Sequence, residues 1–548
     1  MNTRNKIIVL IALICFGILP FSTVEAAKIG KNSCGGTSVP NAYCSFADDG
    51  DGITIGKDSC NVEGACNDLG DGIKIGNNSC NGEDACDSVG ASNGKASIGN
   101  DSCNADDACG YAGESSGDAN IGSNSCNSWY ACYSAGYTNG SAEIGKDACN
   151  GYYACYYSGN SSGEVTVGAG SCNGYKACEF AAYHGGTAEI DKGSCNGDDA
   201  CDYVGASDGK AVIGNDSCNA DDACYYAGYS SGDVNIGANS CNSYYACYDA
   251  GDDGKATIDK DACNGEGACY EAGYSFGGEA TIGAGSCLGY YSCYEAGYSG
   301  YKVVIDKGSC LGYEACYETG YAEIGKDSCI GYYSCIYAGY QGEATIDAGS
   351  CLGYEACYDL AYATDSKATV GKGSCIGYES CYSAAEDGEV TIDAGSCKGD
   401  YACLYAAYDS GGIAEIGKGS CIGYEACEDV GYYGTAVIGK DSCASGDYSC
   451  YDAGYYGDAA IGDKSCNGYY ACYNVAYDSS DTGVTSEIGK QSCNGSQACY
   501  YAGDDYDATI GDGSCNNYES CEYVGISSEE DIDDKDCNMP QECANEAP

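Results

Sequence analysis

The stretch Ile144–Gly159, IGKDACNGYYACYYSG, is repeated along most of the chain with small changes. Close copies are IGKDSCIGYYSCIYAG at 324–339 and IGDKSCNGYYACYNVA at 461–476. Each copy has two cysteines six residues apart, with tyrosines between and after them, and successive copies usually begin 23 residues apart. A fixed period of about 20–50 residues is typical of a solenoid, a propeller or another repeat array.

The residues before each Ile-Gly pair predict a short β-strand. In Ala142-Glu143-Ile144 and Ala280-Thr281-Ile282 the middle side chain is polar and its neighbours are apolar, so two side chains point inward and one outward. Glycine recurs several times in each unit, which disfavours helical repeats. We therefore predict an all-β fold, a parallel β-solenoid (β-helix) of about 22 coils, with roughly 23 residues and one disulfide per coil. At about 4.8 Å per coil, the rod would be roughly 100 Å long.

The chain divides into four predicted segments. Residues 1–26 resemble a signal peptide, because Arg4 and Lys6 precede an apolar run and Val24-Glu25-Ala26 ends in small residues. Residues 27–58 are expected to form an N-terminal cap and an irregular first coil, 59–526 the disulfide-stapled repeats, and 527–548 an acidic C-terminal cap. No second run of about twenty apolar residues follows, so we predict a secreted protein without a membrane span, located outside the cell or on its surface.

The cysteines predict a disulfide framework. Of the 47 cysteines, Cys15 lies in the predicted signal peptide, and the remaining 46 fall into sequential pairs. Thiolate zinc sites are the alternative, but they usually include histidine, and His184 is the only histidine. We favour bridges within each repeat over bridges between neighbouring coils, because the spacing within pairs is constant. Representative predicted bridges are Cys60–Cys66, Cys149–Cys155, Cys329–Cys335 and Cys515–Cys521.

The charge of the chain limits its partners. The formal net charge is -58, and Arg4 is the only arginine. Such a chain repels phosphate backbones and anionic membrane surfaces, so nucleic acid is not an expected partner. The predicted partners are extracellular glycans, minerals or other matrix proteins, and self-assembly is possible.

The turn after each strand often carries an aspartate. IGKDSC (324–329) and IDKGSC (305–310) exchange Gly and Asp between two turn positions. Asp is common in turns because it bonds nearby backbone N–H groups. The alternative is a ladder of stacked carboxylates that binds Ca²⁺, the one cofactor the sequence suggests. The candidate ligands are Asp191, Asp259, Asp306, Asp347 and Asp393.

Two further positions of the repeat allow alternative interpretations. The residue after the first cysteine is Asn from Asn61 to Asn264. It then becomes aliphatic, and an outward orientation would make a stripe for interaction, whereas an inward orientation would make a second kind of stacked ladder. The tyrosines allow the same two interpretations, as ladders that stabilise the stack or as an amphipathic surface for binding. The aliphatic stripe comprises Leu288, Leu311, Ile330, Leu352, Ile376 and Ile422.

Enzyme motifs are not found in the sequence. It has no nucleophile elbow, no phosphate-binding loop and no H-E-x-x-H motif, so we predict that the protein is not an enzyme. Asn-x-Ser/Thr motifs are candidate glycosylation sites in an exported protein. They begin at Asn77, Asn100, Asn139, Asn160, Asn215 and Asn494.

The units SCNGYYAC, SCNGEDAC and IGNDSC resemble the cysteine-rich tandem repeats of secreted proteins from diatoms and related microalgae. This resemblance implies export or a cell-surface location, and it implies no activity. The C-x5-C spacing is also similar to that of disulfide-stapled β-solenoid antifreeze proteins, which carry a regular Thr-x-Thr face. Here the outward strand position varies between Asn120, Glu143, Val212 and Thr281.

From these features we predict a secreted structural or adhesive protein, a stiff, acidic, tyrosine-rich rod or filament subunit of an extracellular matrix or cell surface. The alternative is a calcium-dependent glycan- or mineral-binding module, or an ice-binding protein.

Overall fold

A computed structural model describes most of the repeats. The described residues are 26–35, 44–46, 51–90, 94–113, 118–136, 141–156, 158–159, 164–179, 187–202, 204–205, 210–225, 233–249, 251, 255–271, 273, 279–295, 302–318, 321–336, 339, 343–358, 367–382, 389–404, 413–431, 435–454, 456–475, 484–503, 506–525 and 529–543. Residues 1–25, which include nearly all of the predicted signal peptide, lie outside them, as does His184.

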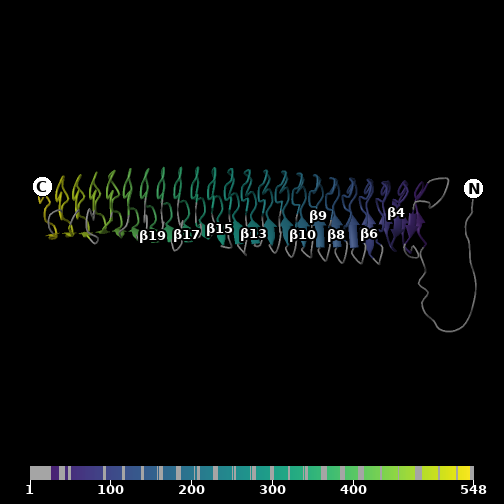
Figure 1. Ribbon diagram of the computed structural model, residues 1–548, viewed down its shortest axis with the longest axis horizontal. Helices are drawn as coiled ribbons and strands as arrows, with labels where there is room; N and C mark the ends of the chain where they lie inside the picture. The colour runs from purple at the N-terminus through teal and green to yellow at the C-terminus, as the bar shows by residue number, and fades with distance from the viewer. Residues whose placement is uncertain are drawn as a thin grey trace, which may run out of the picture.

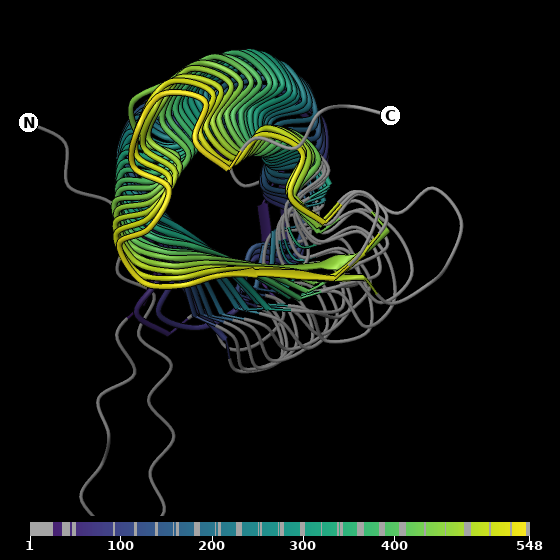
Figure 2. The same ribbon diagram turned by 90° about the vertical axis from the view of Figure 1, so that its left-hand side faces the viewer.

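The chain forms a straight parallel β-solenoid, as predicted. Figure 1 shows the strands stacked along a rod, from purple coils at one end to yellow coils at the other. Figure 2, viewed along the rod, shows that the strands form one flat side while the rest of each coil curves around. The described residues give a 23-stranded parallel sheet, one strand more than the expected number of coils, and a separate two-stranded sheet of β2 and β4.

The strands are β1 (Lys28–Ile29), β2 (Cys44–Phe46), β3 (Thr54–Ile55), β4 (Cys66–Leu69), β5 (Lys74–Ile75), β6 (Lys95–Ile98), β7 (Asp118–Ile121), β8 (Ser141–Ile144), β9 (Glu164–Val167), β10 (Ala188–Ile190), β11 (Ala211–Ile213), β12 (Val234–Ile236), β13 (Lys255–Ile258), β14 (Glu279–Ile282), β15 (Val303–Ile305), β16 (Ala322–Ile324), β17 (Glu343–Ile346), β18 (Lys367–Val370), β19 (Glu389–Ile392), β20 (Ala414–Ile416), β21 (Ala436–Ile438), β22 (Asp458–Ile461), β23 (Thr485–Ile488), β24 (Ala508–Ile510) and β25 (Glu530–Ile532).

Each strand pairs in register with its equivalents in the neighbouring coils. In β8 and β9, Ala142 lies beside Val165 and Ile144 beside Val167. Ala142 and Ile144 are buried, whereas Glu143 between them is exposed, so the predicted inward–outward–inward order is confirmed. The core is therefore a set of ladders, in which each inward side chain packs on the same position of the next coil.

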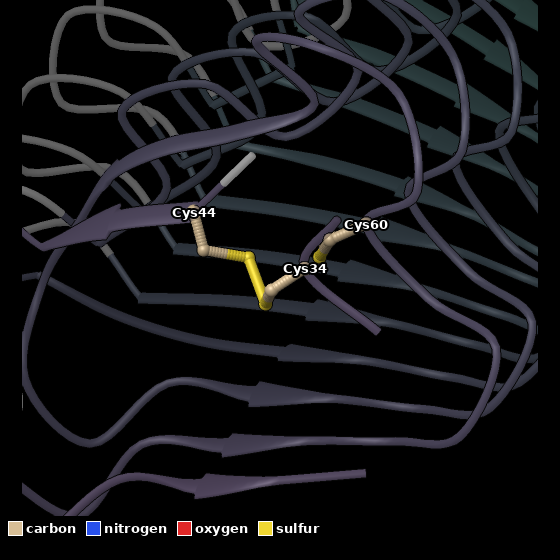
Figure 3. Close-up of side chains that lie close together, drawn as sticks. All are labelled: Cys34, Cys44 and Cys60. Atoms are coloured by element: carbon tan, nitrogen blue, oxygen red, sulfur yellow. A yellow bond between two sulfur atoms is a disulfide. The ribbon is translucent and has the colours of Figure 1, made fainter. Parts of the chain in front are cut away.

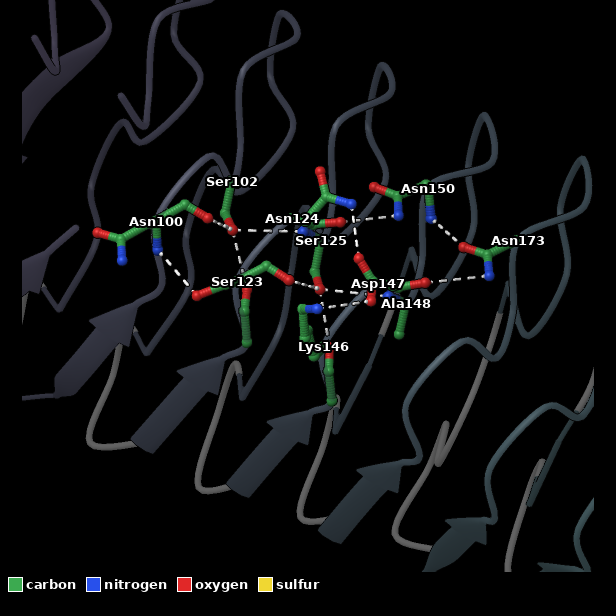
Figure 4. Close-up of polar contacts among 12 residues, drawn as sticks. Asn100, Ser102, Ser123, Asn124, Ser125, Lys146, Asp147, Ala148, Asn150 and Asn173 are labelled. Atoms are coloured by element: carbon green, nitrogen blue, oxygen red, sulfur yellow. Dashed lines mark hydrogen bonds and ion pairs between the residues drawn. The ribbon is translucent and has the colours of Figure 1, made fainter. Parts of the chain in front are cut away.

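A buried serine connects most of the turns to the next coil; Ala148, Ala262 and Asp536 take its place in three coils. The hydroxyl of Ser102, which is fully buried, donates a hydrogen bond to the Gly122 carbonyl (2.8 Å) and accepts one from the Ser125 N–H (3.3 Å). Figure 4 shows this contact and its neighbours. A buried backbone group without a partner is costly, so the repeated serine satisfies turn groups that the strand ladder does not reach.

The cysteines form one bridge within each coil, as predicted. The described residues contain 23 disulfides, from Cys34–Cys44 to Cys537–Cys543. Cys149–Cys155 and Cys329–Cys335 are typical, with Cα–Cα distances of 5.9 and 5.6 Å. Bridges between coils do not occur among these pairs, so the coils are joined to one another by hydrogen bonds, packing and the chain itself.

The two segments predicted as caps form coils in their described residues. At the N-terminal end, β1 pairs in register with β3. At the C-terminal end, β25 pairs in register with β24. The strand ladder therefore extends into both end segments, although the first coil is irregular, with cysteines ten residues apart and a register shift between Cys44 and Phe46.

Two glycines of one coil give a matched test of the stacking. Gly353 has φ of 152°, and a methyl group there would overlap the carbonyl oxygen of Gly377 in the next coil. We expect Gly353→Ala to lower the free energy of unfolding by about 1–3 kcal/mol. Gly349, with φ of 71° and open space around it, serves as the control: Gly349→Asn should be nearly neutral, because Asp327 adopts the same conformation at the equivalent position. Equal effects of both variants in urea unfolding would contradict this account.

Removal of one disulfide tests the independence of the coils. A seven-residue loop closed by Cys329–Cys335 contributes about 2 kcal/mol through the entropy of the unfolded chain. We expect Cys329→Ser/Cys335→Ser to reduce amide-exchange protection in its own coil and the adjoining coils only, because coils contact their nearest neighbours. Loss of protection over the whole rod would show instead that the coils unfold as one unit.

Candidate functional surface

An exposed column of tyrosines runs along the middle of the rod. Its members occupy the third position after the first cysteine of consecutive coils, so the in-register stack places their rings one above another. The centroids are 4.7–5.5 Å apart and the ring planes lie within 15° of parallel. Because the ring faces cover one another, the rings turn their edges and hydroxyl groups to solvent. This outer tyrosine column consists of Tyr290, Tyr313, Tyr332, Tyr354 and Tyr378.

Several of these tyrosines bond to the glutamate that follows them. The hydrogen bond to Glu314, together with desolvation, raises the pKa of Tyr313 to about 12. The bond to Glu379 likewise raises the pKa of Tyr378, and Glu355 does the same for Tyr354. The hydroxyl donates its one hydrogen and the carboxylate accepts it, so each pair presents the acceptor lone pairs of the phenol and carboxylate oxygens to solvent.

A second, half-buried column of tyrosines lies directly after the second cysteine in many of the pairs. The rings of Tyr248, Tyr270, Tyr294 and Tyr317 stack with centroids 4.9–5.0 Å apart. Burial raises the pKa of Tyr270 to about 12. The structural interpretation of the tyrosines is thus confirmed, while the outer tyrosine column is also exposed enough for contact.

Half-buried carboxylates lie beside the inner rings. Burial raises the pKa of Glu318 to about 7, with a contribution from the charge of Glu295 in the preceding coil. Burial also raises the pKa of Glu295. Near the C-terminal end, burial and the neighbouring Asp429 raise the pKa of Asp452 to about 8. The sequence signal for these sites is an acidic residue two positions after the second cysteine in successive repeats, which our sequence analysis missed.

One carboxylate pair is almost fully buried. Asp202 is 3% exposed and Glu179, at the same position of the preceding coil, is 9% exposed. Burial, followed by the charge of Glu179, raises the pKa of Asp202 to about 8. The side-chain nitrogen of Lys176 lies 3.3 Å from a carboxylate oxygen of Glu179. Two acids and one lysine in a dry site favour a proton held on Asp202.

The five calcium candidates do not form a continuous ladder. At this position of the repeat, aspartate and glycine alternate from coil to coil. Gly283, for example, lies in the coil between Asp259 and Asp306. A side chain at Gly283 would meet the backbone of the next coil, which explains why two aspartates do not follow each other. The backbone carbonyls of Asp191, Asp259 and Asp306 accept hydrogen bonds from buried serines, and those of Asp347 and Asp393 do the same. These residues have a clear role in the turn, and calcium binding remains a prediction.

The aliphatic stripe lies at the surface, not inward. Leu288 is 43% exposed and Ile330 36%, and Leu311, Leu352, Ile376 and Ile422 are half-buried. The stripe also marks a second type of ladder. In the early coils the side-chain oxygen of Asn127 accepts the backbone N–H of Asn104 (3.1 Å), whereas in the stripe the backbones pair directly from Leu311 to Ile330 and onward.

The predicted glycosylation sites are partly described. Asn77, Asn100 and Asn215 are exposed and Asn494 is half-buried. The side-chain oxygen of Asn100 accepts the N–H of Asn77 (2.7 Å). Asn139 and Asn160 lie outside the described residues.

The outer face of the sheet carries mixed side chains. Asn120, Glu143 and Val212 are exposed there, as is Thr281. A hollow of about 270 Å³ on this face is lined by Val304, Tyr321, Glu323, Glu343 and Thr345, among others. The outward column has no uniform threonine array of the kind that a regular ice-binding face would need.

Sulfur atoms of neighbouring coils lie close together. The sulfurs of Cys34, Cys44 and Cys60 are within 4.8 Å of one another. Figure 3 shows the three side chains close together. Cys34 is bonded to Cys44 and Cys60 to Cys66. Metal binding needs thiolates. Because these sulfurs are bonded in pairs, they are stacked disulfides and do not offer thiolate ligands.

The fold and surface define a disulfide-stapled, tyrosine-rich β-solenoid. The chain belongs to the family described as Domain of unknown function (DUF7640), whose model matches residues 157–257, 184–283, 231–356 and 405–484, together just over half of the chain. No curated protein and no solved structure gives a significant match. Among the described residues, no helix has the length and apolar character needed to cross a membrane.

The raised pKa of Glu318 predicts an unusual pH dependence. Its folded-state pKa of about 7 lies above the ordinary value of 4.5, so the folded state binds the proton more tightly. The stabilisation is therefore complete below about pH 4.5 and is lost as the pH rises through about 7. We expect a higher melting temperature at about pH 5.5 than at about pH 8, and a smaller difference for Glu318→Gln. The control variant, Glu323→Gln at an exposed position, removes the same charge and should leave this difference in melting temperature unchanged. If both variants reduce the difference equally, the pH dependence comes from net charge alone.

Proposed function

We propose that this protein is a secreted rod with a structural or adhesive role in an extracellular matrix or at a cell surface. The observation that carries the proposal is repetition: the same strand, turn, disulfide and tyrosine positions recur coil after coil. A repeated surface suits a repeated partner, such as a polymer or a solid, because every coil offers the same groups at the same spacing.

The disulfides support a location outside the cytosol. Each coil contains a bridge, and such bridges persist in oxidising compartments and are rare in the cytosol. The predicted signal peptide agrees with this location. The bridges also make a thin rod rigid where its narrow core of alanine, serine and isoleucine buries little apolar area.

The outer tyrosine column gives the adhesive role a chemical form. Its ring faces are occupied by stacking, so a sugar ring has no open aromatic platform within the column. Hydroxyl edges and glutamate carboxylates remain, as in the Tyr313–Glu314 pair. Such pairs suit the hydroxyl groups of neutral glycans or the cations of a mineral surface, whereas anionic polymers are repelled by the charge of -58.

Tyrosine-to-phenylalanine variants test the adhesive surface. Phe at Tyr290, Tyr313, Tyr332, Tyr354 and Tyr378 keeps the stacked rings and removes the hydroxyl groups. We expect binding to insoluble cellulose, chitin or calcium carbonate to fall about tenfold, since several hydrogen bonds are lost, while the melting temperature stays close to that of the wild type.

The matched control replaces the half-buried Tyr248, Tyr270 and Tyr294 by Phe, which should leave binding unchanged. No binding of the wild-type protein to any of the three solids would reject the adhesive role. Binding that is unaffected in the outer variant would place the adhesive surface elsewhere.

A further inference from the structure

At each end of the part of the rod that the structure describes, the last strand has a described neighbour on one side only. Among the described strands, β1 pairs only with β3 and β25 only with β24. Ile29 and Ile532 are half-buried, whereas the same position is nearly inaccessible in interior coils, as at Ile144 (2% exposed). Each end thus exposes apolar and backbone groups that an additional coil would cover.

The sequence of the first coil fits the last coil in the register of the repeat. In both coils the strand isoleucine precedes the first cysteine by five residues, as Ile29 precedes Cys34 and Ile532 precedes Cys537. Placing Ile29 over Ile532 sets Lys28 over Asp531 and Lys31 over Asp534. The ladder therefore continues with opposite charges at two exposed positions.

The strand and first turn of the two end coils also differ in charge. The first nine residues of the described first coil, Ala27–Gly35, carry two lysines and no acidic residue. The last coil, Glu529–Cys543, carries seven acidic residues and one lysine. Opposite charges at a contact favour both its encounter and its register. Cleavage after Ala26, as predicted, would add the α-amino group of Ala27 beside Lys28.

The backbone pattern supports the same contact. Between the last two coils, the Gly511 N–H donates to the Ile532 carbonyl (2.7 Å) and the Cys515 N–H to the Asp536 carbonyl (3.2 Å). Repetition of this pattern directs the N–H of Asp533 to the Ile29 carbonyl of a second copy, and that of Cys537 to its Ser33 carbonyl.

We propose that the C-terminal coil of one rod binds the N-terminal coil of a second copy, so that rods join head to tail into a filament. The contact is heterologous and follows the rod axis, and such a contact gives an open linear assembly rather than a closed ring. The proposal gives the matrix role a specific assembly contact, and it rests on that role only for its biological setting.

Charge exchange between the ends tests the proposal on the secreted protein. We expect negative-stain electron microscopy and sedimentation velocity at low salt to show rods joined end to end, and the joining to weaken as salt rises. Lys28→Asp/Lys31→Asp alone and Asp531→Lys/Asp534→Lys alone should each weaken association about tenfold or more. Mixing the two variants should restore joined rods, since each end then meets an opposite charge.

The control is Lys372→Asp/Lys418→Asp, which makes the same charge change at exposed positions in the middle of the rod and should leave association unchanged. Single rods at every salt concentration would overturn the proposal, as would end variants that associate normally or that mixing does not rescue. Single rods that still bind cellulose, chitin or calcium carbonate would reject the filament and leave the adhesive role standing. Filaments that bind none of these solids would support the head-to-tail contact and reject the adhesive role.

Discussion

Every part of this structure depends on the fixed spacing between successive coils. Parallel strands lie about 4.8 Å apart, and the in-register pairing, as between Ala142 and Val165, holds each residue over its equivalent in the next repeat. A side chain that can stack on its own kind, such as Ile, Ser, Asn or Tyr, is therefore favoured at each position. A side chain that cannot do so, such as an aspartate at Gly283, is confined to alternate coils.

This constraint explains which features were predictable from the sequence. The period, the alternation around Glu143 and the constant cysteine spacing were enough for the parallel solenoid and for disulfides within the coils, because all three are local patterns. In-register pairing of the two end strands was not foreseen. The segments around Lys28 and Ile532 look irregular when composition is compared, yet they keep the distance from isoleucine to cysteine that the stack requires.

The candidate surface was less predictable because it depends on exposure as well as pattern. Tyrosine ladders followed from the repeat, but the sequence did not show that the rings from Tyr290 to Tyr378 expose their edges and cover their faces. The sequence left both orientations open for the stripe at Leu288 and Ile330, and it lies at the surface. The acids at Glu318 and Asp452 were missed because, in so acidic a chain, position alone distinguishes a half-buried carboxylate from a solvated one.

The placement of the disulfides within coils has a mechanical consequence. A bridge such as Cys329–Cys335 locks a loop inside its own coil and ties it to no other. Under tension along the axis, the rod can therefore peel one coil at a time from an end, while each locked loop shortens the length of chain released. Each step breaks a small set of hydrogen bonds that form again when the load is removed. Such a rod would lengthen in many small steps rather than in one rupture.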